Sequence, residues 1–281
     1  MPSDGSLRPE DYQEPNCPLI DPATGQSCHT ESVPMQRVVE KLDEYCDRKD
    51  FAGARRHLDY WLAEAQHLGD KRGEFSMRNE MMGFYRKQGE QDKAIENAQA
   101  ALALMEGTGL AQTSSGGTCY VNTGTVYDQF GMPEEAMTYF RKAQAVFEAL
   151  PHPEHAKLGG LYNNMALALM DTGHYAEAND YYKKAYDMMA QVERGELEQA
   201  ITLLNMSDCL ALELGVEAAQ ETIDGYVARA KELLDTESLP RNGYYAFVCE
   251  KCAPGFYCYG ATEAGAEIEE RANAIYESLK T

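Results

Sequence analysis

Two consecutive stretches between residues 161 and 185 have apolar side chains at a regular helical spacing, with polar side chains between them. In both Leu161–Ala168 and Tyr175–Ala185, apolar residues recur at positions i, i+3, i+4 and i+7, and Gly173 lies between the stretches. This spacing places the apolar side chains of each stretch on one face of a helix. The pattern predicts two amphipathic helices joined by a short turn.

The same unit recurs along the chain at a fixed step. Glycines stand 42 residues apart, at Gly89, Gly131, Gly173 and Gly215. Small residues keep this step at two further positions of the unit: Ala94, Ala136 and Ala178, and then Ala101, Ala143 and Ala185. Glycine reaches the left-handed conformation that ends a helix at little cost, and alanine lets neighbouring helices approach closely. We therefore expect two helices in each repeat.

The unit around residues 161–185, together with the preceding His152-Pro153-x-x-Ala156, resembles a tetratricopeptide repeat of the 42-residue kind found in kinesin light chains. The resemblance is clear over about residues 73–190 and weakens towards both ends. It implies an all-α fold, a right-handed superhelix of about six antiparallel helical pairs over residues 33–281. The expected pairs are about 33–69, 70–107, 116–150, 155–191, 195–235 and 241–280.

Residues 1–32 form a tail rich in Pro, Gly, Ser, Asp and Thr. Such a composition buries too little apolar surface to fold independently. As a hypothesis, residues Leu7–Ile20 of this tail dock on the solenoid, in its groove, as an internal ligand.

The resemblance also indicates where a partner would bind. The first helix of each pair lines the concave side of such a solenoid. Counting back from each repeat glycine places five asparagines on two adjacent inward positions: Asn79, Asn122, Asn163, Asn164 and Asn205. A carboxamide offers a donor and an acceptor together, which suits an extended peptide backbone. The alternative is that these asparagines only bridge neighbouring helices.

One turn further along the first helices, the inward positions carry charges. Arg86 stands in the first of these repeats, Asp128 in the next and Asp171 in the third. A groove that is basic at one end and acidic and apolar along the rest favours a neutral or cationic segment with an apolar anchor. The alternative is that these charges simply face solvent.

The sequence Cys249-Glu250-Lys251-Cys252, followed by Cys258, is the one cluster with metal-binding potential. Zinc needs four ligands, and the missing ones would have to come from the tail, from Cys17, Cys28 or His29. The competing interpretation is that the thiols pack as small apolar groups among the aromatic residues around them. Pro254 within this segment predicts a broken or kinked helix.

The composition limits the partners further. The chain has 46 acidic and 25 basic side chains and a formal charge of −21, which disfavours nucleic acid and anionic membranes. We find no secretion signal and no apolar run of about 18 residues, so we expect a cytoplasmic protein with reduced thiols. No catalytic or nucleotide-binding motif is present, so neither enzymatic activity nor a cofactor is expected.

These observations predict a non-enzymatic scaffold that binds a protein or peptide segment in an asparagine-lined groove. Two alternatives remain: a peptide-sensing regulator that acts on a separate partner, and a solenoid organised by a cysteine-based zinc site. A homodimer is compatible with each of them, through the groove or through the aromatic patch near the C-terminus, which consists of Tyr244, Tyr245, Phe247, Phe256, Tyr257 and Tyr259.

Overall fold

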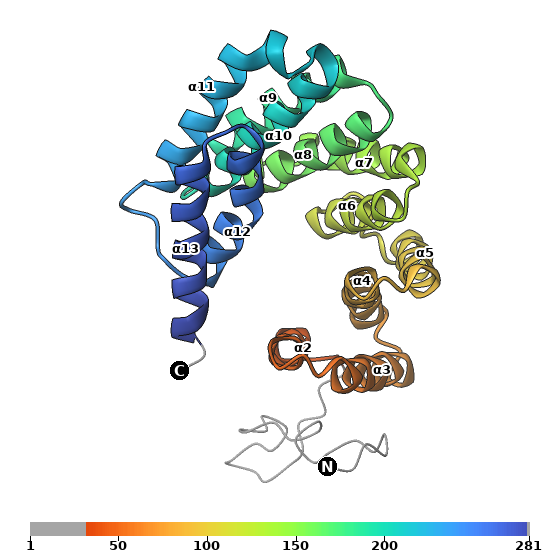
Figure 1. The fold of residues 1–281 in the computed structure, drawn as a ribbon. Helices are drawn as coiled ribbons and strands as arrows, with labels where there is room; N and C mark the ends of the chain where they lie inside the picture. Colours follow the sequence, from red (N-terminus) through yellow and green to blue (C-terminus); the bar gives the residue numbers. More distant parts are fainter. Residues whose placement is uncertain (1–31, 280–281) are drawn as a thin grey trace. The chain divides into compact units, whose positions relative to one another are not determined.

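The structure is a computed structural model that describes residues 32–279, without the side chain of Leu279. Twelve helices occupy this range and no strand occurs in it (Figure 1). The chain divides into two compact units, residues 1–130 (unit 1) and 131–281 (unit 2). The division falls in the turn between α6 and α7, inside the predicted pair 116–150. Each unit is described by itself.

Unit 1 holds five helices. They are α2 (Met35–Asp47), α3 (Phe51–Leu68), α4 (Lys71–Lys87), α5 (Gln91–Thr108) and α6 (Ser114–Gln129). Helices α2, α4 and α6 are the first helices of their repeats, and α4 packs against both of the other two. The core around them is rich in sulfur and aliphatic groups, with Leu58, Met77, Met82 and Met105 fully buried.

Unit 2 holds seven helices. They are α7 (Pro133–Glu148), α8 (His155–Asp171), α9 (Tyr175–Met189), α10 (Glu196–Leu214), α11 (Val216–Leu234), α12 (Gly243–Cys258) and α13 (Thr262–Leu279). Here α8, α10 and α12 are the first helices, and α10 packs against both of the others. The core is more aromatic than that of unit 1, with Phe140, Tyr182, Tyr245 and Phe256 fully buried.

The described residues hold twelve helices, the number that six pairs require, and the fold is all-α. The repeated alanines stand where the helices meet. All six of them are completely shielded from solvent: Ala94, Ala101, Ala136, Ala143, Ala178 and Ala185. Any larger side chain at these positions would push two helices apart.

Three of the repeat glycines end a first helix as predicted. Gly89, Gly131 and Gly173 have φ angles of 72°, 75° and 76°, in the left-handed region. Gly215 differs, because its φ of 84° is combined with a ψ of 148°. It is the only residue between α10 and α11, whereas three residues separate the two helices in each of the other repeats. This shorter turn explains why Ala219 follows its glycine one position early.

Short polar side chains begin several helices. Asp50 and Asp70 each accept a hydrogen bond from the backbone N–H three residues later, over 2.8 Å, at the starts of α3 and α4. Asn242 does the same at the start of α12, over 3.0 Å. These caps satisfy N–H groups that have no partner within their own helix.

The predicted break at Pro254 does not occur. Helix α12 continues through this residue to Cys258. The Pro254 side chain is exposed, so its ring does not displace a helix packed against α12. Hydrogen bonds on both sides of the proline then keep the helix continuous.

Candidate binding faces of the first helices

The two predicted asparagines of unit 1 bond to each other. The Asn122 Nδ2 on α6 donates to the Asn79 Oδ1 on α4 over 3.2 Å, and both side chains are half-buried. The pair ties together two successive first helices. Much of the hydrogen-bonding capacity of these carboxamides is therefore used inside the protein.

Arg86, the predicted charged residue on α4, also forms hydrogen bonds within the protein. The Arg86 guanidinium donates to the Gln129 Oε1 over 2.6 Å, and the Gln129 Nε2 donates back to the Arg86 carbonyl oxygen over 3.2 Å. Asp128, on the same turn of α6, is half-buried. Helices α4 and α6 are thus bridged at two levels.

In unit 2 one predicted asparagine is part of the interior. Asn163 on α8 is only 8% exposed. Its Nδ2 donates to the Thr202 Oγ1 on α10 over 2.9 Å, and Thr202 donates to the Asn163 Oδ1 over 3.2 Å. This reciprocal pair joins the two helices, so Asn163 bridges helices and is not available to a partner.

The other predicted residues of unit 2 lie nearer to solvent. Asn164 and Asn205 are half-buried on α8 and α10, and Asp171 is exposed at the end of α8. The Asn205 carboxamide makes no hydrogen bond within residues 32–279. It is the predicted residue whose donor and acceptor groups are both open to a ligand.

Helix α10 presents further polar groups beside Asn205. Glu198 lies seven residues before Asn205, which is the same side of a helix, and Asp208 lies three residues after it. Each carboxylate receives the hydroxyl of a tyrosine from the next repeat. The Tyr244 hydroxyl donates to Glu198, and the Tyr259 hydroxyl donates to the Asp208 Oδ1 over 2.6 Å. These bonds orient both acids at the junction of α10 and α12.

The electrostatics of this junction follow from partial burial. Burial raises the pKa of the Glu198 carboxyl, and the nearby Lys251 ammonium acts in the opposite direction. Burial and the hydrogen bond to Asp208 raise the pKa of the Tyr259 hydroxyl, so this group remains a donor at neutral pH. Lys251 is the basic side chain that α12 contributes to the junction.

Two aromatic side chains lie on the exposed side of α12. Tyr244 and Phe247 are 50% and 52% exposed, and their rings stack with a centroid separation of 6.3 Å. We call the solvent-facing residues Asn205, Glu198, Asp208, Tyr244 and Phe247 the acidic-aromatic face. Sequence reasoning selected Asn205 for the groove, placed Tyr244 and Phe247 only in the aromatic patch near the C-terminus, and missed Glu198 and Asp208. The seven-residue step from Asn205 back to Glu198 is the signal that could have found the first of them.

The cysteine cluster lies in the same helix. Cys249 and Cys252 are buried, and burial raises the pKa of Cys252 to about 12, whereas Cys258 is exposed at the helix end. Among the side chains of residues 32–278, no three His, Cys, Asp or Glu groups are gathered so that they could hold a metal ion. The tail residues Cys17, Cys28 and His29, and the tail segment Leu7–Ile20, lie outside the described residues.

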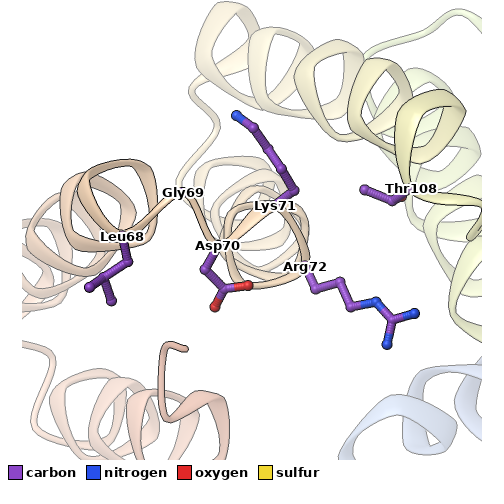
Figure 2. A pocket seen from close by; sticks show the side chains of 6 residues that line it. All are labelled: Leu68, Gly69, Asp70, Lys71, Arg72 and Thr108. Atoms are coloured by element: carbon purple, nitrogen blue, oxygen red, sulfur yellow. The ribbon is translucent and has the colours of Figure 1, made fainter. Parts of the chain in front are cut away.

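A cavity of about 610 Å³ in unit 1 lies at the start of α4, beside residues 68–72 and Thr108. Figure 2 shows Lys71 and Arg72 leaving the first turn of α4 in different directions. The Asp70 carboxylate caps this helix, and the Lys71 ammonium pairs with Glu74 over 2.9 Å. Because the carboxylate occupies the helix N-terminus, this cavity is poorly suited to an anion.

A second cavity, of about 380 Å³, lies in unit 2 among α9, α10 and α11. Its apolar floor is formed by Leu203 and Met206, and Arg229 lies at its edge. The Arg229 guanidinium pairs with Glu232 over 2.8 Å within α11. None of the residues that line this cavity belongs to the acidic-aromatic face.

Comparison with known proteins agrees with this architecture. Two tetratricopeptide-repeat family models match residues 74–149 and 159–193. No curated protein sequence matches the chain. None of the helices between residues 32 and 279 combines the length and the apolar character needed to cross a membrane.

Several solved structures have the same fold. BtubC (BKLC) from P. vanneervenii superposes with a TM-score of 0.65 at 19% identity, covering 74% of this chain and 84% of BtubC. A Podosopora anserina protein described as a kinesin light chain with nearly identical TPR-like repeats gives 0.51 at 15% identity, covering 72% of this chain and 94% of that protein. NprR, in complex with its cognate peptide NprX, gives 0.56 at 13% identity, covering 84% of this chain and 65% of NprR.

The chain thus has the tetratricopeptide-repeat fold, and residues 74–149 and 159–193 match tetratricopeptide-repeat families. Its repeats resemble those of kinesin light chains, as their 42-residue step indicates.

Proposed function

We propose that this protein is a non-enzymatic scaffold that binds an extended segment of another polypeptide on the first helices of unit 2. The observation that carries the proposal is the Asn205 carboxamide, which is half-buried, fixed on a rigid helix and without a hydrogen bond inside residues 32–279. A carboxamide in this state can donate to a backbone carbonyl and accept from a backbone N–H of one extended ligand.

The fold supports this proposal. A tetratricopeptide-repeat structure with the same architecture, NprR, holds a peptide. The asparagines of unit 1 make a weaker candidate site, because Asn79 and Asn122 already bond to each other. Any ligand there would first have to break that bond.

The test uses random peptides displayed on phage, selected on the whole chain, followed by fluorescence polarisation with the synthesised winners. Asn205→Ala should weaken binding by roughly threefold to tenfold, the range expected for one or two hydrogen bonds. Asn79→Ala, the same truncation in unit 1, is the matched control and should leave the affinity unchanged.

Three results would count against the proposal. Selection of no binding peptide removes peptide binding as the function. Equal binding by wild type and Asn205→Ala removes Asn205 from the site. A loss confined to Asn79→Ala transfers the site to unit 1.

A regulator that senses a peptide and acts on a separate protein would use the same face. The similarity to peptide-bound NprR favours this second candidate. Such a regulator differs from a simple scaffold because peptide binding must change its affinity for a second protein. Isothermal titration of that protein with and without the selected peptide would show such coupling.

A further inference from the structure

The acidic-aromatic face of unit 2 combines negative charge with exposed rings. Residues 195–228, which include all of α10 and most of α11, contain seven acidic side chains and no Lys, Arg or His. Two of the acids, Glu198 and Asp208, belong to the face itself, and Tyr244, which bonds to Glu198, stacks on the exposed ring of Phe247. This combination attracts cations both by charge and through the ring faces.

We infer that the partner segment is basic, and that it carries two Lys or Arg residues four or five positions apart, one for Glu198 and one for Asp208. The inference rests on the proposed function, because it names the chemistry of the peptide that the face would bind. The other acids of the surface then steer the approaching segment.

The spacing follows from helix geometry. Glu198 and Asp208 are ten residues apart on α10, which is about 15 Å along the helix axis. An extended chain advances about 3.3 Å per residue, so it covers this distance in four to five residues. Asn205 lies between the two acids, where it would meet the backbone of the segment.

The tyrosine hydroxyls prepare both acids for this role. Each hydroxyl occupies one acceptor position of its carboxylate, at Glu198 and at Asp208, and a carboxylate has about four such positions. The remaining positions can receive a guanidinium or an ammonium group. Because the hydroxyls fix the carboxylates, little side-chain entropy is lost on binding.

The groups that oppose a cation are few. Lys251 is the basic side chain on the described part of α12 and lies near Glu198. This one ammonium stands against the seven acids of residues 195–228, and the exposed Phe247 ring adds a surface on which an arginine can stack. An apolar residue of the partner segment can pack against the exposed rings of Tyr244 and Phe247.

The experiment uses a panel of labelled synthetic peptides that share one Leu anchor and have two arginines separated by zero, three or nine residues. Parallel sets carry lysines, glutamates or serines in place of the arginines. Affinities are measured by fluorescence polarisation with the whole chain. The arginine peptide with three intervening residues should bind tightest, by about tenfold over the serine version, and its affinity should fall as salt rises from about 0.05 M to about 0.5 M.

Isosteric variants locate the contacts. Glu198→Gln and Asp208→Asn keep an oxygen that can accept the tyrosine hydroxyl, and each should weaken the arginine peptide by about tenfold. Glu221→Gln removes an exposed acid on α11 and is the matched control, with an effect within about twofold. Circular dichroism of all three variants checks that folding is unchanged.

The results separate this inference from the proposed function. If serine peptides bind as well as arginine peptides, and Asn205→Ala weakens both, the face binds peptides but does not select basic ones. If affinity rises with charge at every spacing, and Glu221→Gln matters as much as Glu198→Gln, the attraction is general and the paired recognition is wrong. Absence of any binding across the panel and the phage selection refutes the proposed function itself.

Discussion

The two units are built from one repeat but differ in what their first helices leave open. In unit 1, Asn79 bonds to Asn122 and Arg86 bonds to Gln129, so polar groups on α4 and α6 satisfy each other. In unit 2, Asn163 bonds to Thr202, and Glu198 and Asp208 on α10 accept tyrosine hydroxyls from α12, whereas the Asn205 carboxamide makes no hydrogen bond within residues 32–279. Asparagines at equivalent positions of the repeat therefore bridge helices at Asn79 and Asn163 but not at Asn205.

The surfaces differ in charge and in apolar exposure as well. Residues 32–130 contain 15 acidic and 12 basic side chains, whereas residues 131–281 contain 25 acidic and 12 basic ones. Six of the eight large exposed apolar or aromatic side chains of the described chain belong to unit 2. These are Leu212, Leu214, Val216, Tyr244, Phe247 and Tyr257. An acidic surface with exposed apolar groups is a better candidate interface than the more nearly neutral unit 1.

The largest expected effect tests whether the units are energetically separate. Leu58→Ala in unit 1 and Leu161→Ala in unit 2 each remove a fully buried side chain, at an expected cost of about 2–5 kcal/mol. The single tryptophan, Trp61, lies in α3 of unit 1, so its fluorescence reports unit 1 alone. In urea titrations Leu58→Ala should shift the fluorescence transition, and Leu161→Ala should shift only part of the helical circular dichroism signal. Equal shifts of both signals in both variants would show one cooperative structure.

A smaller effect distinguishes bridging from available asparagines. Asn163→Ala should lower the free energy of unfolding by about 1–3 kcal/mol, since it leaves the buried Thr202 side chain without one of its partners. Asn205→Ala should change it by less than about 0.5 kcal/mol, because this carboxamide makes no internal bond. Urea unfolding followed by circular dichroism measures both. Similar destabilisation by the two substitutions would mean that Asn205 also has a structural role.

Glycine substitutions in α4 and its terminal turn test the backbone of unit 1. Gly89 has a φ of 72°, so Gly89→Ala should destabilise the protein by about 1–2 kcal/mol. Gly83 lies within α4, where an added Cβ meets no atom within 4 Å. Gly83→Ala should therefore stabilise the protein by about 0.5–1 kcal/mol. Thermal unfolding monitored by Trp61 fluorescence compares the two, and a loss of stability in Gly83→Ala would contradict the open surroundings of that position.

The smallest effect concerns the ion pairs between α11 and α13 of unit 2. Burial alone would raise the pKa of Asp235, but hydrogen bonds from Lys231 and Arg271 outweigh it and hold that pKa below its ordinary value. The same two bases hold the pKa of Glu267 low. Carboxyls with lowered pKa values stabilise the fold above the pKa they have when unfolded, near pH 4, and lose this contribution as pH falls through the folded pKa.

Arg271→Met should therefore cost at most about 1 kcal/mol at pH 7, since the carboxylates are partly exposed, and should reduce the loss of stability between pH 5 and about pH 3. Urea unfolding at the two pH values checks this. Arg229→Met removes an ion pair confined to α11 and is the control, with an unchanged pH dependence. A wild-type stability that does not fall in acid would refute the stabilising role of these pairs.

Much of the fold could be predicted from local sequence because the repeat is itself local. The glycine step located the ends of the first helices, and the alanine positions are the buried helix contacts. The break predicted at Pro254 as one of two outcomes is wrong, because α12 continues through this residue. A residue's propensity is a weak guide where tertiary packing holds the surrounding segment.

The candidate site was predicted less completely. Register placed five asparagines on inward positions, but it could not show that three of them bond to groups on neighbouring helices. It also missed Glu198 and Asp208, since one acid among 46 carries no signal of its own. Glu198 and Asp208 differ from the other acids because they accept the hydroxyls of Tyr244 and Tyr259, which lie 46 and 51 positions away in the sequence.

The sequence by itself determined the helical pairs, because helix periodicity, terminal glycines and small contact residues act within a few residues of one another. Tertiary structure alone decided which polar groups remain for a partner. Whether a carboxamide or a carboxylate is satisfied depends on the group that the next repeat places beside it, some 40 to 50 residues away. In this protein Asn79, Asn122 and Asn163 form hydrogen bonds with neighbouring helices, whereas the Asn205 carboxamide forms none within residues 32–279.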